Sequence, residues 1–184
     1  MLTSASKSVT SDTAGPSDRL DEPVTVAMLR EIGLFGALSD EVLQRLTKTL
    51  KTRRVAPGDA VFREDDTFAH EMYALLEGEM EVTKRSRRGR DLRVALLGPN
   101  DCFGEMSLID LQARSATVRA VAPSRLLTLT SEDMDALYRS DLKSYTLIVL
   151  NIARDMSRRL RVTDGIMAEF AANVLDEYVT AKKG

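Results

Sequence analysis

Length and composition predict one globular domain, because 184 residues with 43% hydrophobic side chains can bury one sizeable core but not two large ones. The 26 basic and 28 acidic residues give a net charge of −2, which argues against coating nucleic acid or an anionic membrane through bulk charge. A single cysteine and a single histidine exclude a disulfide framework, a Cys-rich zinc site and most histidine-based catalysis. No bilayer-spanning run or signal peptide is visible, so we expect a cytoplasmic protein.

The first 50 residues divide into a tail and two short helices. Residues 1–24 are rich in serine and threonine and lack aromatic side chains, which predicts a flexible tail. From residue 26 onward, apolar residues recur at helical spacing, and Gly33 and Gly36 separate two helical stretches. Ser39 is a good N-cap for the second of them.

Residues 51–130 predict many short strands. Aliphatic or β-branched runs alternate with turn signals such as Pro57-Gly58, Gly78 and Gly98-Pro99. The predicted strands are 53–55, 60–62, 72–76, 80–84, 92–97, 116–121 and 125–130. Residues 103–110, FGEMSLID, read as a short helix inside this region. The fold class is therefore mainly β, a sandwich or barrel with flanking helices.

Helical periodicity returns after residue 130. Ser131 is the predicted cap of a short helix, and a long helix follows over residues 141–163. Asp164-Gly165 is expected to interrupt it, with a second apolar stripe continuing to the end. The long helix carries a coiled-coil-like seam, which would either cover the barrel or pair two copies into a homodimer: Leu142, Tyr145, Val149, Ile152, Met156 and Leu160.

The stretch from residue 98 to residue 120 carries the chemistry. Gly104 permits close approach of a ligand to the backbone at the start of the short helix, where free N–H groups are available. Arg114, nine residues after Glu105, can return to the same pocket and suits a phosphate. The Glu105 carboxylate suits sugar hydroxyls, so the pattern indicates a ligand of nucleotide size.

This stretch resembles the phosphate-binding segment of the cyclic nucleotide-binding domain family. The signature FGE…RSATVRA carries the resemblance, with PGD before VFRED, then YALLEGEMEV and LLGPNDCFGE in support. The resemblance implies an eight-stranded jelly-roll β-barrel with N-terminal helices, a short phosphate-binding helix and a long C-terminal helix. The domain would cover residues 25–163, and residues 164–184 would form a helical extension.

The family's functional positions map onto ten residues of this chain. The resemblance implies that Glu105 takes the ribose 2′-hydroxyl and that Arg114 pairs with the cyclic phosphate. Backbone N–H groups near Gly104, Ser115 and Ala116 would complete the phosphate cradle. The full predicted set is Phe103, Gly104, Glu105, Met106, Ser107, Arg114, Ser115, Ala116, Arg159 and Thr163.

The resemblance extends to the long helix, and two positions of the motif differ from the family pattern. By resemblance Thr163 would contact the base, Arg159 would lie nearby, and Asp164 could reach across from a partner subunit. Leu111 stands where the family often has glycine, and Ala113 where proline is common, which predicts a differently shaped turn. Serine at position 115, where cGMP-preferring members often have threonine, favours cAMP over cGMP as the ligand.

The function that the resemblance implies is a stand-alone sensor that passes its signal through the C-terminal helix to an effector protein. No metal, cofactor or enzymatic activity is expected, because one histidine cannot supply the ligands of a cupin-type site. A transcription regulator is disfavoured because only 21 residues follow Thr163, too few for a helix-turn-helix, so no nucleic acid partner is expected. A degenerate barrel that only dimerises or docks stays an alternative.

Several residues also have purely structural interpretations. Glu105 and Arg114 could form an ion pair that locks a turn. The basic run from Lys84 to Arg93 is read as a solvated hairpin around Gly89. His70 is predicted to lie in a surface loop. Cys102 is predicted to be a buried small side chain that no neighbour activates.

Overall fold

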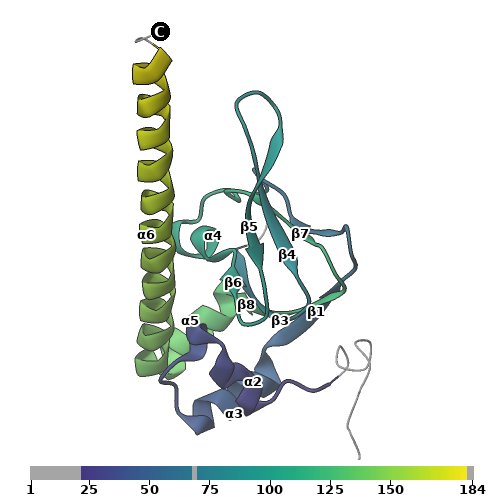
Figure 1. Ribbon diagram of the computed structural model, residues 1–184. Helices are drawn as coiled ribbons and strands as arrows, with labels where there is room; N and C mark the ends of the chain where they lie inside the picture. The colour runs from purple at the N-terminus through teal and green to yellow at the C-terminus, as the bar shows by residue number, and fades with distance from the viewer. Residues whose placement is uncertain (1–21, 68–69, 182–184) are drawn as a thin grey trace, which may run out of the picture.

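The computed structural model describes residues 22–67 and 70–181, so most of the predicted tail, residues 1–21, lies outside the described residues. A barrel of short strands has helices at one end, and one long helix runs beside it and past it (Figure 1). This arrangement is the eight-stranded jelly-roll with flanking helices that the sequence predicts.

The N-terminal helices form where the sequence predicts them. Helix α2 (Val26–Glu31) is followed by a 3₁₀ turn, η1 (Gly33–Phe35), and by helix α3 (Asp40–Thr49). The Ser39 side chain accepts a hydrogen bond from the Val42 backbone N–H, which confirms the predicted N-cap. The buried faces of these helices pack on the first sheet, described next, through Leu29, Leu43 and other apolar side chains.

The barrel consists of two four-stranded antiparallel sheets. The first has the order β1 (Lys51–Val55), β8 (Ser124–Thr130), β3 (Glu71–Glu77) and β6 (Cys102–Phe103). The second has the order β2 (Ala60–Phe62), β7 (Thr117–Ala120), β4 (Met80–Arg85) and β5 (Asp91–Leu97). The hairpin of β4 and β5 projects from the barrel (Figure 1).

Strand β6 is the element that the sequence prediction missed. It has two residues, Cys102 and Phe103, which pair with Ala74 and Tyr73 of β3. Two residues before a glycine produce no detectable alternation, so β6 forms through its pairing with β3 rather than through a local pattern. The strand nevertheless matters, because it delivers the chain directly into Gly104 and helix α4 (Glu105–Asp110).

Strand β3 is buried on both faces and separates two hydrophobic cores. Its residues Tyr73 and Leu75 point into the barrel, in a cluster with Phe103 and residues of the second sheet. Met72, Ala74 and Leu76, which alternate with them, pack against the helices. A fully buried aliphatic or aromatic side chain stabilises the fold by roughly 1.5–3 kcal/mol, so both faces of this strand contribute.

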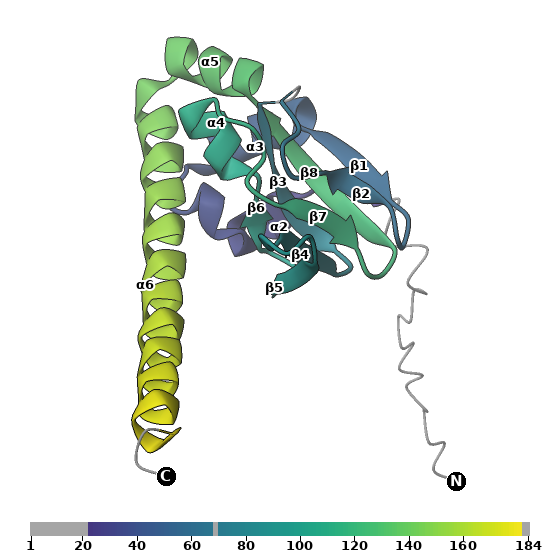
Figure 2. The ribbon, with the colours of Figure 1, turned by 90° about the horizontal axis from the view of Figure 1, so that it is seen from above.

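Two predictions about the C-terminal helices were wrong. Helix α5 (Ser131–Ser140) is capped by Thr130 rather than Ser131, because the Thr130 side chain accepts from the Asp133 N–H in a capping box. Helix α6 (Leu142–Ala181) continues through Asp164-Gly165 without the predicted break (Figure 2). Glycine in a helix interior is unfavourable by only about 1 kcal/mol relative to alanine, so it does not by itself end a 40-residue helix.

The predicted seam of α6 divides into a buried part and an exposed part. Ile152 is buried, and Tyr145, Val149 and Met156 pack partly against the helical core. Ile148, which the seam prediction omitted, is fully buried. The apolar side chains in the rest of the seam and beyond it are more than two fifths exposed: Leu142, Leu160, Val162, Ile166, Met167, Phe170 and Val174. No helix within residues 22–67 and 70–181 is both long and apolar enough to span a membrane.

Candidate functional site

Gly104 connects β6 to α4 in a conformation that suits glycine. Its φ of 83° and ψ of 2° lie in the left-handed region, which side chains other than glycine enter at a cost. A Cβ atom there would lie 2.8 Å from Nη1 of Arg114 and 3.1 Å from the Glu71 carbonyl oxygen. The absence of a side chain at Gly104 therefore allows the Arg114 guanidinium to lie against the backbone at the start of α4.

Arg114 is a buried cation with an unused donor. Its side chain is held by hydrogen bonds from Nη1 to the carbonyl oxygens of Glu71 (2.8 Å) and Gly104 (3.0 Å). Its Cζ lies 4.1 Å from the centroid of the Phe62 ring, a cation–π contact. The residue is only 4% exposed, and its Nη2 is buried without a hydrogen-bond partner among the residues that the structure describes. A buried unpaired donor on a guanidinium is unfavourable unless an anion takes it.

Burial also acts on the ionisation of Arg114. Desolvation lowers the pKa of its guanidinium, while the negative charges of Glu71, Asp66 and Glu105 partly oppose that effect. The group remains charged at neutral pH, because arginine has the highest pKa of the side chains. The charge therefore persists in a site whose hydrogen bonds leave one side of the guanidinium unsatisfied.

Glu105 is paired with the long helix rather than with Arg114. Glu105 is 7% exposed as a residue, and its Oε1 lies 3.5 Å from Nη1 of Arg159. Nη2 of Arg159 donates to the Cys102 carbonyl oxygen and forms an ion pair with Asp155 at 2.8 Å. The alternative of a turn locked by a Glu105–Arg114 ion pair is therefore not what the described residues show. Instead, Arg159 attaches α6 to the start of α4.

The remaining predicted residues of α4 and β6 have mixed environments. Phe103 is buried and stacks on Tyr73 at a centroid distance of 5.3 Å. Ser107 is also buried, and its hydroxyl donates to the Gly104 carbonyl oxygen, which fixes the first turn of the helix. Met106 is 44% exposed and its sulfur accepts a hydrogen bond from the Ser115 hydroxyl. Phe103 and Ser107 thus support the site, whereas Met106 lies at its surface.

The segment that follows Arg114 reaches the edge of the barrel. Ser115 is exposed and Ala116 is partly buried, immediately before β7. The backbone of Arg114 is anchored on the turn after β2, because its N–H donates to Asp66 and its carbonyl oxygen accepts from Asp65, both at 2.9 Å. The backbone just before Ser115 and Ala116 is therefore fixed by the two hydrogen bonds of Arg114.

Thr163 and His70 each contact a backbone carbonyl oxygen, and the contact of Thr163 with a base stays a prediction. Thr163 is exposed, and its hydroxyl donates to the Arg159 carbonyl oxygen within α6, so its recorded contact is internal to the helix. His70 lies in a loop directly before β3, as the sequence predicts, and its Nδ1 is 3.0 Å from the Ser107 carbonyl oxygen. His70 is thus partly buried against α4.

Leu111 ends α4 in the left-handed conformation. Its φ is 57° and its ψ is 23°, and its side chain is 65% exposed. Glycine is the residue that most often ends a helix in this way, because it has no Cβ to clash. Leu111 therefore adopts the same left-handed turn that glycine would form, although leucine adopts this conformation less easily.

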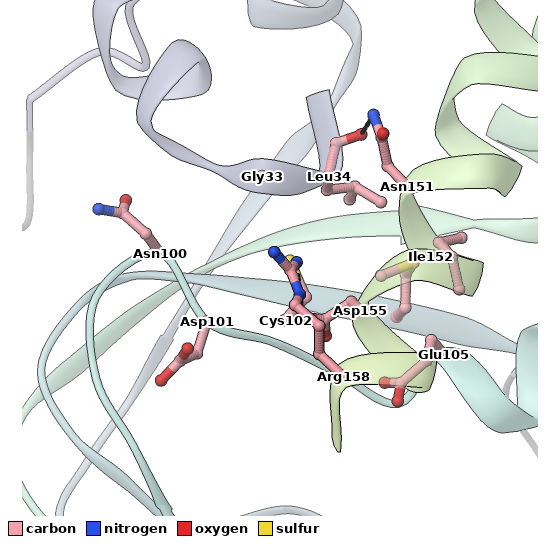
Figure 3. Close-up of a pocket in the computed structure, with 11 residues that line it drawn as sticks. Gly33, Leu34, Asn100, Asp101, Cys102, Glu105, Asn151, Ile152, Asp155 and Arg158 are labelled. Carbon is pink, nitrogen blue, oxygen red and sulfur yellow. Dashed lines mark hydrogen bonds and ion pairs between the residues drawn. The ribbon is translucent and has the colours of Figure 1, made fainter. Parts of the chain in front are cut away.

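A cavity of about 260 Å³ lies between η1, β6 and α6 (Figure 3). Of the ten predicted site residues it contains Glu105 alone. Asn151 of α6 borders it and donates to the carbonyl oxygens of Leu34 (3.0 Å) and Gly36 (2.9 Å). Cys102 also borders it, and burial raises the pKa of this thiol to about 12, so the thiol is not activated. Because these elements are distant in sequence, no local pattern could have predicted the cavity.

Metal ligands do not gather at either place. Within the described ranges, no group of three His, Cys, Asp or Glu side chains is arranged to hold a metal ion. The charged groups that do converge are Arg114, on the Gly104 carbonyl oxygen at the start of α4, and the Glu105–Arg159 pair beside it. This arrangement suits an anionic, hydroxyl-bearing organic ligand.

Comparison with known proteins finds a matching domain family and curated relatives that are named for cyclic AMP. Residues 52–141 match the family model described as the cyclic nucleotide-binding domain. The chain is 34% identical over 131 residues to the cyclic AMP receptor protein of Thermus thermophilus, covering 71% of this chain and 58% of that protein. It is 32% identical over 109 residues to the cAMP-dependent protein kinase regulatory subunit of Yarrowia lipolytica, covering 59% and 28%. The chain thus spans less than two thirds of either curated relative.

This chain superposes on nearly the whole of one solved domain structure. The N-terminal domain of a transcriptional regulator from Streptomyces coelicolor superposes with a TM-score of 0.63 at 30% sequence identity. The match covers 72% of this chain and 94% of that one. The relatives therefore agree with the fold of the barrel and its helices.

Proposed function

The chain belongs to the cyclic nucleotide-binding domain family, and we propose that it binds a cyclic nucleotide, cAMP in preference to cGMP, as a regulatory sensor. The observation that supports this most is the buried Arg114 side chain, whose Nη2 has no hydrogen-bond partner within residues 22–67 and 70–181. A cyclic phosphate carries one negative charge and free oxygens, so it would satisfy that donor and neutralise the buried cation. The preference for cAMP rests on Ser115 alone.

Glu105 is proposed to bind the ribose 2′-hydroxyl. Its carboxylate is nearly buried and its recorded ion pair, with Arg159, has a separation of 3.5 Å. A carboxylate accepts hydrogen bonds through two oxygens, so Glu105 can accept a hydroxyl while it keeps contact with the guanidinium. Occupation of Glu105 would therefore act on Arg159 and through it on α6.

Signal output is proposed to run through α6 to an effector. Arg159 connects α6 to Glu105 and to the Cys102 carbonyl oxygen, so a ligand that shifts either group changes where the helix is held. A ligand can shift this equilibrium only by binding one helix position better than the other. The proposal includes that the sensor passes its signal to a separate effector protein and that it lies in the cytoplasm.

The exposed half of α6 is proposed to pair two copies of the chain. Leu160, Thr163, Met167, Phe170 and Val174 repeat at alternating spacings of three and four residues, which is the spacing of a coiled-coil seam. The four apolar members of this set are about half exposed or more. Sedimentation equilibrium of the full chain tests the pairing, and a monomer at high micromolar concentration would refute it.

DNA binding is a second candidate because the similar Streptomyces coelicolor domain belongs to a transcriptional regulator. In the present chain, residues 164–181 continue α6 rather than forming two helices. The absence of a nucleic acid partner stays a prediction. Specific gel-shift binding at moderate salt would contradict it.

Isothermal titration calorimetry with cAMP and cGMP tests the proposed ligand. We expect the unmodified chain to bind, with cAMP the tighter ligand, and Arg114→Ala or Arg114→Leu to weaken binding by at least a hundredfold, because a phosphate loses its buried charged partner. Arg139→Ala is a matched control, since Arg139 is a surface residue of α5 paired with Asp135. Unchanged cAMP affinity in both Arg114 variants would refute the site, and no binding by the unmodified chain would favour the docking alternative.

A further inference from the structure

Lys84, at the end of β4, reaches across the second sheet to the segment that follows Arg114. Its Nζ donates to the Ser115 carbonyl oxygen at 2.5 Å and to Oε1 of Glu64 at 3.1 Å. The other oxygen of Glu64 accepts from the Arg85 backbone N–H at 2.8 Å. The hydrogen bond from the Arg85 backbone lowers the pKa of the Glu64 carboxyl most, and the hydrogen bond from Lys84 lowers it further. Lys84 is therefore held in place by a charged partner.

This contact separates Lys84 from the rest of the basic run. The turn of the hairpin closes at Gly89, whose N–H donates to the Ser86 carbonyl oxygen at 2.8 Å, as the sequence predicts for a solvated hairpin. Arg87 and Arg88 are exposed residues of that turn. Lys84 lies on the strand instead, and its ammonium group contacts the backbone next to Arg114.

The contact also orients a peptide group. In a trans peptide the carbonyl oxygen of one residue and the N–H of the next point in opposite directions, and the described residues contain no cis peptide. Asp65 holds the Arg114 carbonyl, so the Ser115 N–H points away from Asp65. Lys84 holds the Ser115 carbonyl, so the Ala116 N–H points away from Lys84. Two successive N–H groups beside Arg114 are thereby given fixed directions.

We propose that Lys84 is a positioning residue of the phosphate site, which orients the Ser115–Ala116 peptide by holding the Ser115 carbonyl oxygen. This inference rests on the proposed binding of a cyclic nucleotide. Pre-oriented donors bind an anion more tightly than donors that must first be ordered. The phosphate and ribose are common to cAMP and cGMP, so Lys84 contributes equally to the binding of both.

The Lys84–Glu64 pair contributes little to folding stability. The Lys84 side chain is 54% exposed and that of Glu64 is 21% exposed. Ion pairs in contact with water stabilise proteins only weakly, because solvent screens them and the side chains lose freedom. Replacing Lys84 therefore changes ligand affinity without unfolding the barrel, which makes the two effects separable.

Calorimetry on the full chain tests this role with three variants. Lys84→Met removes the charge and the donor at similar length, and we expect it to weaken cAMP and cGMP binding by the same factor, about fivefold, as for a charge-assisted hydrogen bond that is partly open to water. Lys84→Arg, which keeps charge and donors, should restore affinity to within about twofold of the unmodified chain. Arg88→Met changes the charge of the same hairpin and should leave affinity unchanged.

The outcomes distinguish a failure of the proposed nucleotide binding from a failure of the proposed role of Lys84. If the unmodified chain binds neither nucleotide, the proposed function fails. If it binds and Lys84→Met binds equally well, or Arg88→Met weakens binding as much, the role of Lys84 is refuted. Unequal losses for cAMP and cGMP would place Lys84 at the base and also overturn the assignment. Melting of the ligand-free Lys84→Met variant within about 2 °C of the unmodified chain supports positioning rather than a folding defect.

Discussion

Replacing Leu111 by glycine should stabilise the protein, because Leu111 is a non-glycine residue in the left-handed conformation. Its φ is 57°, and for such residues this conformation is unfavourable by roughly 1–2 kcal/mol. Glycine removes that strain but makes the unfolded chain more flexible, which opposes it by about 0.4–1 kcal/mol. The side chain is 65% exposed, so little buried surface is lost. The net expectation is a gain of about 0.5–1 kcal/mol.

Thermal and urea denaturation of Leu111→Gly and Leu111→Ala measure this effect. A gain of that size in a chain of 184 residues raises Tm by about 1–4 °C. Leu111→Ala keeps the strained backbone and removes the same side chain, so it should not gain stability. If Leu111→Gly is no more stable than Leu111→Ala, the strain argument is wrong.

Three further substitutions have expected outcomes. Gly104→Ala would place a Cβ 2.8 Å from Nη1 of Arg114 in a left-handed residue, so it should lower Tm and weaken cAMP binding at least tenfold, measured by calorimetry. Gly165→Ala, in open space within α6, should instead raise Tm, because alanine favours a helix interior over glycine by about 1 kcal/mol. Asp141 has its pKa lowered by hydrogen bonds from the Ser144 side chain and backbone, so its contribution is present above about pH 4 and is lost as acid protonates it. Asp141→Asn should therefore make the decrease of Tm below pH 4 shallower, and an unchanged pH profile would contradict this cause.

The sequence predicted the positions of seven strands and of the short helix at residues 103–110, but not the two-residue strand β6 or the continuity of α6. Most of these seven strands were visible because they contain a run of aliphatic or β-branched residues between turn signals. Strand β6 was not, because two residues carry no periodicity and pair only through β3. The predicted break at Asp164-Gly165 was wrong because a local preference of about 1 kcal/mol is small within a helix of 40 residues.

The candidate site was predictable in its charged residues but not in what surrounds them. The motif placed Arg114 and Glu105 near one another, and the structure brings both to the start of α4. Phe62 and the Glu71 carbonyl oxygen, which hold Arg114, were missed because an aromatic ring and a backbone atom far away in sequence leave no pattern. Lys84 was hidden within a basic run, since composition does not distinguish a lysine that contacts Ser115 from solvated neighbours.

Strand β3 has a thermodynamic consequence for the molecule. Successive side chains of one short strand belong alternately to the barrel interior and to the helical layer, so neither layer can lose its packing without exposing the other. The helices and the barrel should therefore melt cooperatively in a single calorimetric transition rather than one after the other.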